Sequence, residues 1–164
     1  MVKKLLAIVC GAALLTACAS KQNGAELYGD STGGWRSDVD ISALDATGLT
    51  KKFNNDTTPV VYFQLNSSDL DSTAKSALAE QAAWLRKNPR ALIVIEGNCD
   101  ERGTTEYNFA LGERRANAAR RYLVSNGVES NRIRTISYGK EKPVATGSNE
   151  EAWAKNRNAT TVAY

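Results

Sequence analysis

The stretch from Leu92 to Arg115 constrains the fold more than any other part of this chain. It opens with the run from Leu92 to Ile95, which is apolar, mostly β-branched and predicts a buried strand. Gly97 ends that strand, and a loop crowded with charged side chains follows it. Apolar residues then recur at helical spacing from Tyr107 to Tyr122. The sequence therefore predicts a strand, a polar loop and a helix that pack together.

Arg115 falls inside the apolar stripe of that expected helix. A bare buried charge is too costly to keep, so this arginine is either paired or serves a ligand. Asn108 and Leu111 share its helix face, and Asp100 stands in the loop before the helix. We expect these groups to converge on one pocket. Spacing alone leaves two interpretations open: Asp100 and Arg115 hold a ligand, or they form a structural ion pair.

This central run resembles that of the OmpA-like peptidoglycan-binding domains, in particular those of lipoproteins in Tol–Pal systems. The resemblance covers about residues 60–164 and includes the segments 61–63, 82–89, 137–143 and 155–157. A match of this length is far more specific than a short motif. It implies an α/β sandwich in which a βαβαβ(α)β order forms a mixed sheet with two long helices on one face.

The resemblance also implies that Asp100 and Arg115 hold a diaminopimelate-containing stem peptide of peptidoglycan. Such a peptide carries a carboxylate beside an ammonium. The planar fork of an arginine suits the carboxylate, and an aspartate suits the ammonium. Free backbone N–H groups at the helix start can hold a carboxylate as well. The other predicted peptidoglycan-binding residues are Asn108, Thr104, Leu111, Phe63 and Asn66.

Three positions depart from the commonest pattern of the family. Gln64 and Asn66 stand where many relatives carry acidic side chains, so the sequence leaves open whether that loop contacts a ligand ammonium. Asn158 replaces a second arginine that often follows the Lys-Asn-Arg triplet, which could weaken a surface contact with glycan or a partner protein. No cofactor or metal site is predicted, since one thiol and scattered carboxylates lack ligand spacing.

The beginning of the chain looks like a bacterial lipoprotein signal. A short basic start precedes an apolar stretch, Leu5 to Leu15, that is too short to span a bilayer as a mature helix. The residues from Leu15 to Cys18 look like a lipobox, so residues 1–17 are the predicted signal peptide and Cys18 the lipidation site. An ordinary signal with an incidental cysteine is the alternative. No aspartate follows Cys18, which in such lipoproteins implies the outer membrane, facing the periplasm.

Removal of that signal leaves 19 basic and 18 acidic side chains, a net charge of +1. Nucleic-acid binding is not expected, because phosphate affinity needs many clustered cations. Residues 18–58 mix Gly with Ser, Thr, Asp and Asn and are predicted as the lipidated N-terminus and a flexible tether. Such a tether has an r.m.s. reach of roughly 35 Å and a stretched length of roughly 130 Å. Docking of Trp35 or residues 41–44 on the domain stays open.

Residues 59–164 are the predicted OmpA-like domain. Its expected strands cover residues 60–65, 91–96, 132–138 and 158–164, the last as a closing edge strand. One helix is capped by Asp71 or Ser72 and ends at Pro89, and a second covers residues 106–125. A capping box of Ser148 and Glu151 predicts a third, short helix.

Cys99 is the one cysteine of the predicted mature chain besides Cys18, so no intramolecular disulfide is expected. We interpret it as a small buried hydrophobic residue; a catalytic thiol is the alternative, but the chain has no histidine to serve as its base. Neither a zinc site nor a nucleophile–base pair is evident, so an enzyme such as a cell-wall amidase is not predicted.

The predicted function is therefore that of a non-catalytic outer-membrane lipoprotein. By resemblance, it binds peptidoglycan and tethers the outer membrane to the cell wall, within a Tol–Pal-type system that supports envelope integrity and cell division. The alternative is a structural or signalling lipoprotein that acts mainly through a TolB-like periplasmic protein of the Tol system. Co-sedimentation with purified peptidoglycan separates the two.

Overall fold

The computed structural model describes residues 48–164. The predicted signal peptide, Cys18 and the tether up to residue 47 lie outside the described residues. The elements, in chain order, are α1 (Leu49–Asp56), β1 (Val60–Tyr62), α2 (Ser72–Lys87), β2 (Ile93–Asn98), α3 (Thr105–Ser125), the 3-10 helix η3 (Ser130–Arg132), β3 (Ile133–Gly139), α4 (Glu150–Asn156) and β4 (Asn158–Ala163).

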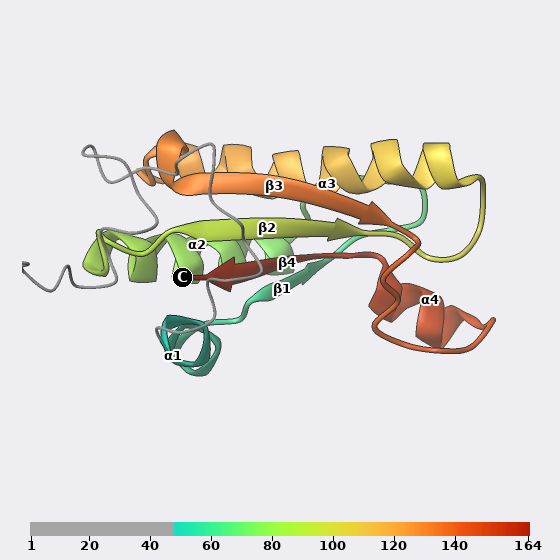
Figure 1. Cartoon of the computed structure of the whole chain (residues 1–164), viewed down its shortest axis with the longest axis horizontal. Coiled ribbons are helices and arrows are strands. Elements are labelled where there is room, and N and C mark those ends of the chain that lie inside the picture. Colours follow the sequence, from blue (N-terminus) through green and yellow to red (C-terminus); the bar gives the residue numbers. More distant parts are fainter. Residues whose placement is uncertain (1–47) are drawn as a thin grey trace, which may run out of the picture.

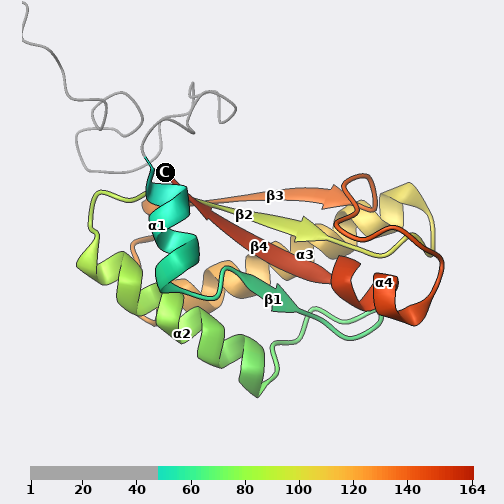
Figure 2. The ribbon, with the colours of Figure 1, turned by 90° about the horizontal axis from the view of Figure 1, so that it is seen from below.

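The four strands form one mixed sheet in the order β1-β4-β2-β3. Strands β2 and β3 are parallel, whereas β4 runs antiparallel to both β1 and β2. The long helices α2 and α3 lie together on one face of the sheet (Figure 1). The view from below places α1 across one end of the sheet and α4 at the other (Figure 2). The predicted α/β architecture and its βαβαβ(α)β order are confirmed, with α1 added before them.

The hydrophobic core lies between the sheet and the two long helices. Ile93 and Ile95 of β2 contribute to it together with Leu78 and Leu85 of α2 and Leu123 of α3, all fully buried. Each such side chain contributes roughly 1.5–3 kcal/mol relative to an exposed one. Strand β2 is buried as its apolar run predicted: Ile93 and Ile95 face this core, and Val94 between them is buried too.

Helix α1 corrects the predicted domain boundary. The sequence placed residues up to 58 in a flexible tether, yet Leu49–Asp56 form a helix against the domain. Phe53 is fully buried and meets Trp84 edge-on, with ring centroids 5.1 Å apart. The indole N–H of Trp84 donates to Asp56 at 2.9 Å. Eight residues with one large aromatic give too short a pattern for periodicity to detect, so tertiary packing decides the helix.

Two smaller predictions also differ from the structure. Strand β4 is an inner strand, because Ala159 pairs with Val61 on one side and with Gly97 on the other. The alternation of a strand shows which face it buries but not its place in the sheet. The cap of α4 is Asn149, whose side chain accepts from Ala152 N–H at 2.9 Å, rather than the neighbouring serine. Asparagine and serine cap helices about equally well.

The two ends of the sheet carry different elements. Helix α1 and the C-terminal end of β4 lie at one end; the ends of β2 and β3, the loop from β2 to α3, and helix α4 lie at the other (Figure 1). The residues predicted to bind peptidoglycan belong to this second end. Among the described helices, none combines the length and apolar character needed to cross a bilayer.

Candidate functional site

A glycine contact brings helix α3 against strand β2 and so sets the geometry of the site. A Cβ at Gly97 would collide with the backbone carbonyl of Gly112, and a Cβ at Gly112 would collide with the Ser137 hydroxyl. That hydroxyl donates to the carbonyl of Phe109 at 2.6 Å, which ties β3 to the same helix. The close approach places Arg115, three residues after Gly112, beside the end of β2.

Arg115 is the largest fully buried side chain of the described domain, with 1% of its surface exposed. Its guanidinium donates to three backbone carbonyls: Nε to Ser67 at 2.9 Å, Nη1 to Asn98 at 2.8 Å and Nη2 to Gln64 at 3.1 Å. The guanidinium carbon lies 5.2 Å from the ring centroid of Phe63. Arg115 therefore ties the end of β2 to the loop that follows β1.

This arrangement changes the predicted role of the Arg115 fork. Its hydrogen bonds to backbone carbonyls occupy the donors that a ligand carboxylate would need for bidentate binding. Asn66, another predicted site residue, lies exposed in the loop that Arg115 holds and has a positive φ of 53°. Bidentate binding of a ligand carboxylate by Arg115 would require the carbonyls of this loop to move away from the guanidinium.

Asp100 is buried as well, with 5% of its surface exposed. Its Oδ1 accepts from the backbone N–H of Arg102 at 3.1 Å and from Nε of the same residue at 3.2 Å. Its Oδ2 accepts from Arg102 Nη2 at 2.6 Å and from Arg157 Nη1 at 3.4 Å. Burial acts to raise the pKa of Asp100, but the Arg102 and Arg157 hydrogen bonds outweigh it and lower that pKa, so the carboxylate is charged at neutral pH.

The ion pairs of Asp100 are therefore not those that the spacing suggested. Within the described residues, its partners are Arg102 and Arg157, and no ion-pair contact joins it to Arg115. Two arginines thus pair with one buried carboxylate, and Arg157 also pairs with Glu150, so the charges of these four side chains balance. The Asp100 carboxylate is the group of this cluster that could match a ligand cation.

Helix α4 closes the site, and sequence reasoning missed its contribution. Glu150 accepts from Arg157 Nη2 at 2.6 Å, while the guanidinium of Arg102 lies over the ring of Trp153, 4.0 Å from its centroid. Arg102 belongs to the central run and Arg157 to the segment 155–157, so the resemblance could have indicated both. Glu150 and Trp153 carried no such signal, because only tertiary packing brings α4 to the loop.

The remaining predicted residues support the site more than they line it. Phe63 and Leu111 are buried, and Asn108 Nδ2 donates to the backbone carbonyl of Arg102 at 2.8 Å. Thr104 caps α3, because its hydroxyl accepts from Tyr107 N–H at 3.2 Å. The first N–H groups of α3 have no acceptor within the helix and lie at exposed residues beside the loop.

Cys99 packs within the same cluster. It is buried, its Sγ donates to the carbonyl of Asn108 at 3.3 Å, and Arg115 Nη1 lies 3.4 Å from the sulfur. Burial raises the pKa of this thiol even though Arg115 opposes the shift, so the thiolate form is disfavoured. Among the described residues, no cluster of three His, Cys, Asp or Glu side chains could hold a metal ion.

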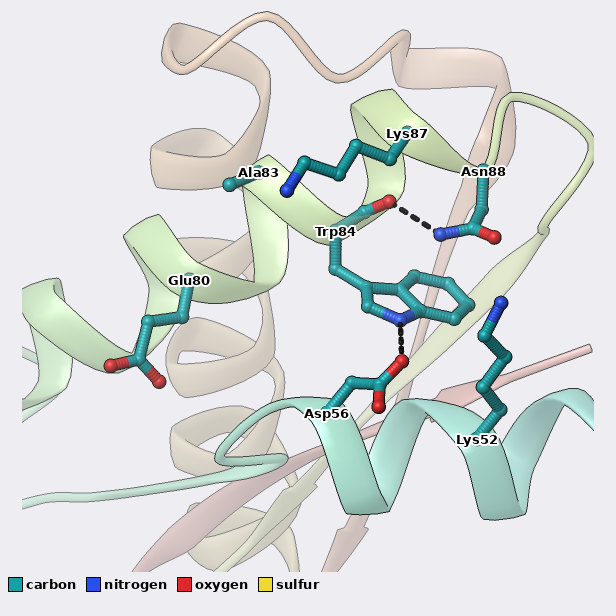
Figure 3. Close-up of a pocket in the computed structure, with 7 residues that line it drawn as sticks. All are labelled: Lys52, Asp56, Glu80, Ala83, Trp84, Lys87 and Asn88. Atoms are coloured by element: carbon teal, nitrogen blue, oxygen red, sulfur yellow. Dashed lines mark hydrogen bonds between the residues drawn. The ribbon is translucent and has the colours of Figure 1, made fainter.

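A separate hollow of about 610 Å³ lies between α1 and α2 (Figure 3). It shares no residue with the predicted site. The Trp84 indole at its centre already donates to Asp56, and Asn88 Nδ2 donates to the Trp84 carbonyl at 2.9 Å. Its rim mixes Lys52 and Lys87 with carboxylates of both helices. The hollow is a seam between two helices rather than a convergent set of binding groups.

The fold and the site identify the class of protein. Residues 62–157 match the OmpA family, and the chain belongs to that family. The chain also superimposes on solved structures of low identity, such as the C-terminal domain of Helicobacter pylori MotB, with 21% identity and a TM-score of 0.60 over 64% of this chain and 83% of that one. At that identity the likeness concerns the fold alone.

Relatives of higher identity place the chain within that family, among the peptidoglycan-associated lipoproteins. The protein of that name from Rhizobium meliloti (strain 1021) is 47% identical over 149 residues, which cover 90% of this chain and 80% of the relative. The one from Haemophilus influenzae (strain ATCC 51907 / DSM 11121 / KW20 / Rd) is 40% identical and covers 95% of this chain and 94% of its own. The crystal structure of the peptidoglycan-associated lipoprotein from Burkholderia pseudomallei has 44% identity and a TM-score of 0.64, over 65% of this chain and 91% of that one.

Proposed function

We propose that this chain binds peptidoglycan without catalysis, through a stem peptide that contains diaminopimelate. The names of its relatives and its OmpA-family domain support association with peptidoglycan. The observation that carries the choice of ligand is the buried, charged Asp100, which pairs with Arg102 and Arg157, together with the buried Arg115 of the neighbouring helix. The free end of a diaminopimelate side chain bears an ammonium and a carboxylate on one carbon, and this site offers both complementary charges.

The two charges of the ligand would be held by different parts of the site. The ammonium would pair with Asp100 at the loop. The carboxylate would lie toward the first N–H groups of α3, where the helix dipole favours an anion. Arg115 would act through its positive charge and by holding the loop of residues 64–67 in place. Thr104 and Asn108 would hold in place the loop that carries Asp100.

The proposed cellular role extends the same resemblance. Lipidation at Cys18 would anchor the chain to the outer membrane, with the domain facing the periplasm, so that wall binding links membrane and peptidoglycan. Relatives that are named lipoproteins support this part of the proposal. A role in a Tol–Pal-type system, with a TolB-like partner and a contribution to cell division, belongs to the same proposal.

The test is calorimetric titration of a stem peptide that ends in diaminopimelate. Asp100→Asn keeps the shape but removes the charge, and loss of one partner of a desolvated pair costs roughly 2–5 kcal/mol, or about 30- to several-thousand-fold in affinity. Glu113→Gln is the matched control, because it removes an exposed carboxylate from helix α3, the helix that follows the Asp100 loop. Titration runs below the melting temperature of every variant. Wild-type affinity in folded Asp100→Asn would refute the proposed site.

A further inference from the structure

Arg102 occupies the place on Asp100 that a ligand cation would need. Its guanidinium and its backbone N–H together make three hydrogen bonds to the carboxylate, at 2.6–3.2 Å. The Asp100 side chain is 6% exposed, whereas that of Arg102 is 34% exposed. Arg157, the other ion-pair partner, is itself buried. Arg102 is therefore the partner on the solvent side of Asp100, and Arg157 the partner on the inner side.

We infer that Arg102 is an internal competitor that sets the affinity and cation selectivity of this site. A ligand ammonium can reach Asp100 only when the Arg102 guanidinium leaves it, so binding exchanges one cation for another. The inference rests on the proposed function and names the group that the ligand must displace. The exchange keeps the charge balanced, because Asp100 carries a cation partner both before and after it.

The surroundings of Arg102 allow this exchange without a rearrangement of the loop. Asn108 holds the carbonyl of Arg102 at 2.8 Å, and Lys140 holds the carbonyl of Gly103 at 2.8 Å, so the backbone stays in place. The displaced guanidinium already has two neighbours, since Glu150 lies 3.9 Å from Nη1 and the Trp153 ring lies 4.0 Å away. A side-chain rotation is enough to move Arg102 from the carboxylate to these groups.

Removal of Arg102 should leave the fold intact, because Arg157 continues to neutralise Asp100 from the inner side. This makes Arg102→Gln an informative variant. It should bind the diaminopimelate-ended peptide more tightly than the wild type, by roughly 3- to 10-fold, the scale of a partly exposed bidentate ion pair. A residue that itself contacts the ligand, or merely attracts its anionic groups, would give weaker binding when removed.

The control is Arg121→Gln, which removes the same charge from an exposed position of α3. Its affinity should equal that of the wild type. A second measurement uses Arg102→Ala with added ethylguanidinium, which should fill the vacated place on Asp100 and weaken peptide binding back toward the wild-type value. The same additive at the same concentration should leave the wild type nearly unchanged.

The outcomes separate this inference from the proposed function. Tighter binding by Arg102→Gln, reversed by ethylguanidinium in the alanine variant, supports the competitor role. Equal or weaker binding by Arg102→Gln, with a wild type that binds and an Asp100→Asn variant that does not, overturns the competitor role alone. Absence of peptide binding by the wild type overturns both.

Discussion

Replacement of Arg115 by lysine should lower the stability of the domain even when no ligand is present. The arginine reaches three carbonyls that lie on two separate segments, residues 64–67 and the end of β2. A lysine ammonium is a single point on a flexible stem and can serve one of these segments but not both. At least one charge-assisted hydrogen bond, and in the usual case two, would be lost.

Each hydrogen bond to a charged group contributes roughly 1.5–3 kcal/mol, so the loss of two amounts to roughly 3–6 kcal/mol. The carbonyls of Gln64 and Ser67 belong to an exposed loop and can turn to water, which favours the lower end of that range. We therefore expect Arg115→Lys to lower the free energy of unfolding by about 3 kcal/mol. For a domain of roughly 100 residues this corresponds to a fall in Tm of about 10–20 °C.

Thermal and urea unfolding followed by circular dichroism measure this effect directly. Arg121→Lys is the control, since an exposed substitution away from special features changes stability by less than about 0.5 kcal/mol. A Tm for Arg115→Lys within about 2 °C of the wild type would refute the structural role of the fork. It would also restore the original expectation that the fork is available to a ligand.

Three other predictions concern the acid range, the helix–strand contact and the anchor. The pKa of Asp100 is lower in the folded chain than its usual value of 3.8, so the stabilisation by its carboxylate is present above that pH and is lost as the pH falls through the lowered pKa. The difference in unfolding free energy between wild type and Asp100→Asn, measured by urea titration, should therefore shrink between about pH 5 and pH 2. A difference that stays constant over this range would contradict the prediction. Gly112→Ala should lower Tm and weaken peptide binding together, because its Cβ would push α3 away from Ser137 and Gly97; an unchanged Tm would contradict this. Cys18→Ser should give an unprocessed or soluble periplasmic form, because acyl burial supplies the membrane affinity, and fractionation with outer membranes would exclude the anchor.

Local patterns in the sequence were sufficient for most of the fold. The β-branched run before Gly97 and the apolar spacing of α2 and α3 correctly predicted a strand and two long helices, because those signals extend over many residues. Helix α1 escaped prediction because Phe53 is its one buried residue. The inner position of β4 escaped for a different reason, since pairing order is a property of the whole sheet.

The sequence brought Asp100 and Arg115 to one end of the fold, but it did not predict which groups they contact. The apolar stripe of the helix predicted the burial of Arg115, which is confirmed, whereas Asp100 was expected in a polar loop and is buried as well. These contacts could not be read from the spacing of residues, because Arg115 donates to carbonyls 48 and 51 positions earlier in the chain and Asp100 accepts from an arginine 57 positions later. Contacts between residues so far apart in the chain produce no periodic pattern in the sequence.

The placement of α1 and the site at opposite ends of the sheet has a mechanical consequence. Under the proposed function, the membrane pulls on the chain that enters α1, and the wall pulls on the loop that Arg157 supports (Figure 1). Strand β1 is then drawn from its start at Val60, and β4 from its start at Asn158, in opposite directions along a shared antiparallel ladder. The ladder hydrogen bonds lie across the pulling direction and carry the load together, in shear, instead of opening one after another. The domain is therefore oriented to resist tension between the two layers that it would connect.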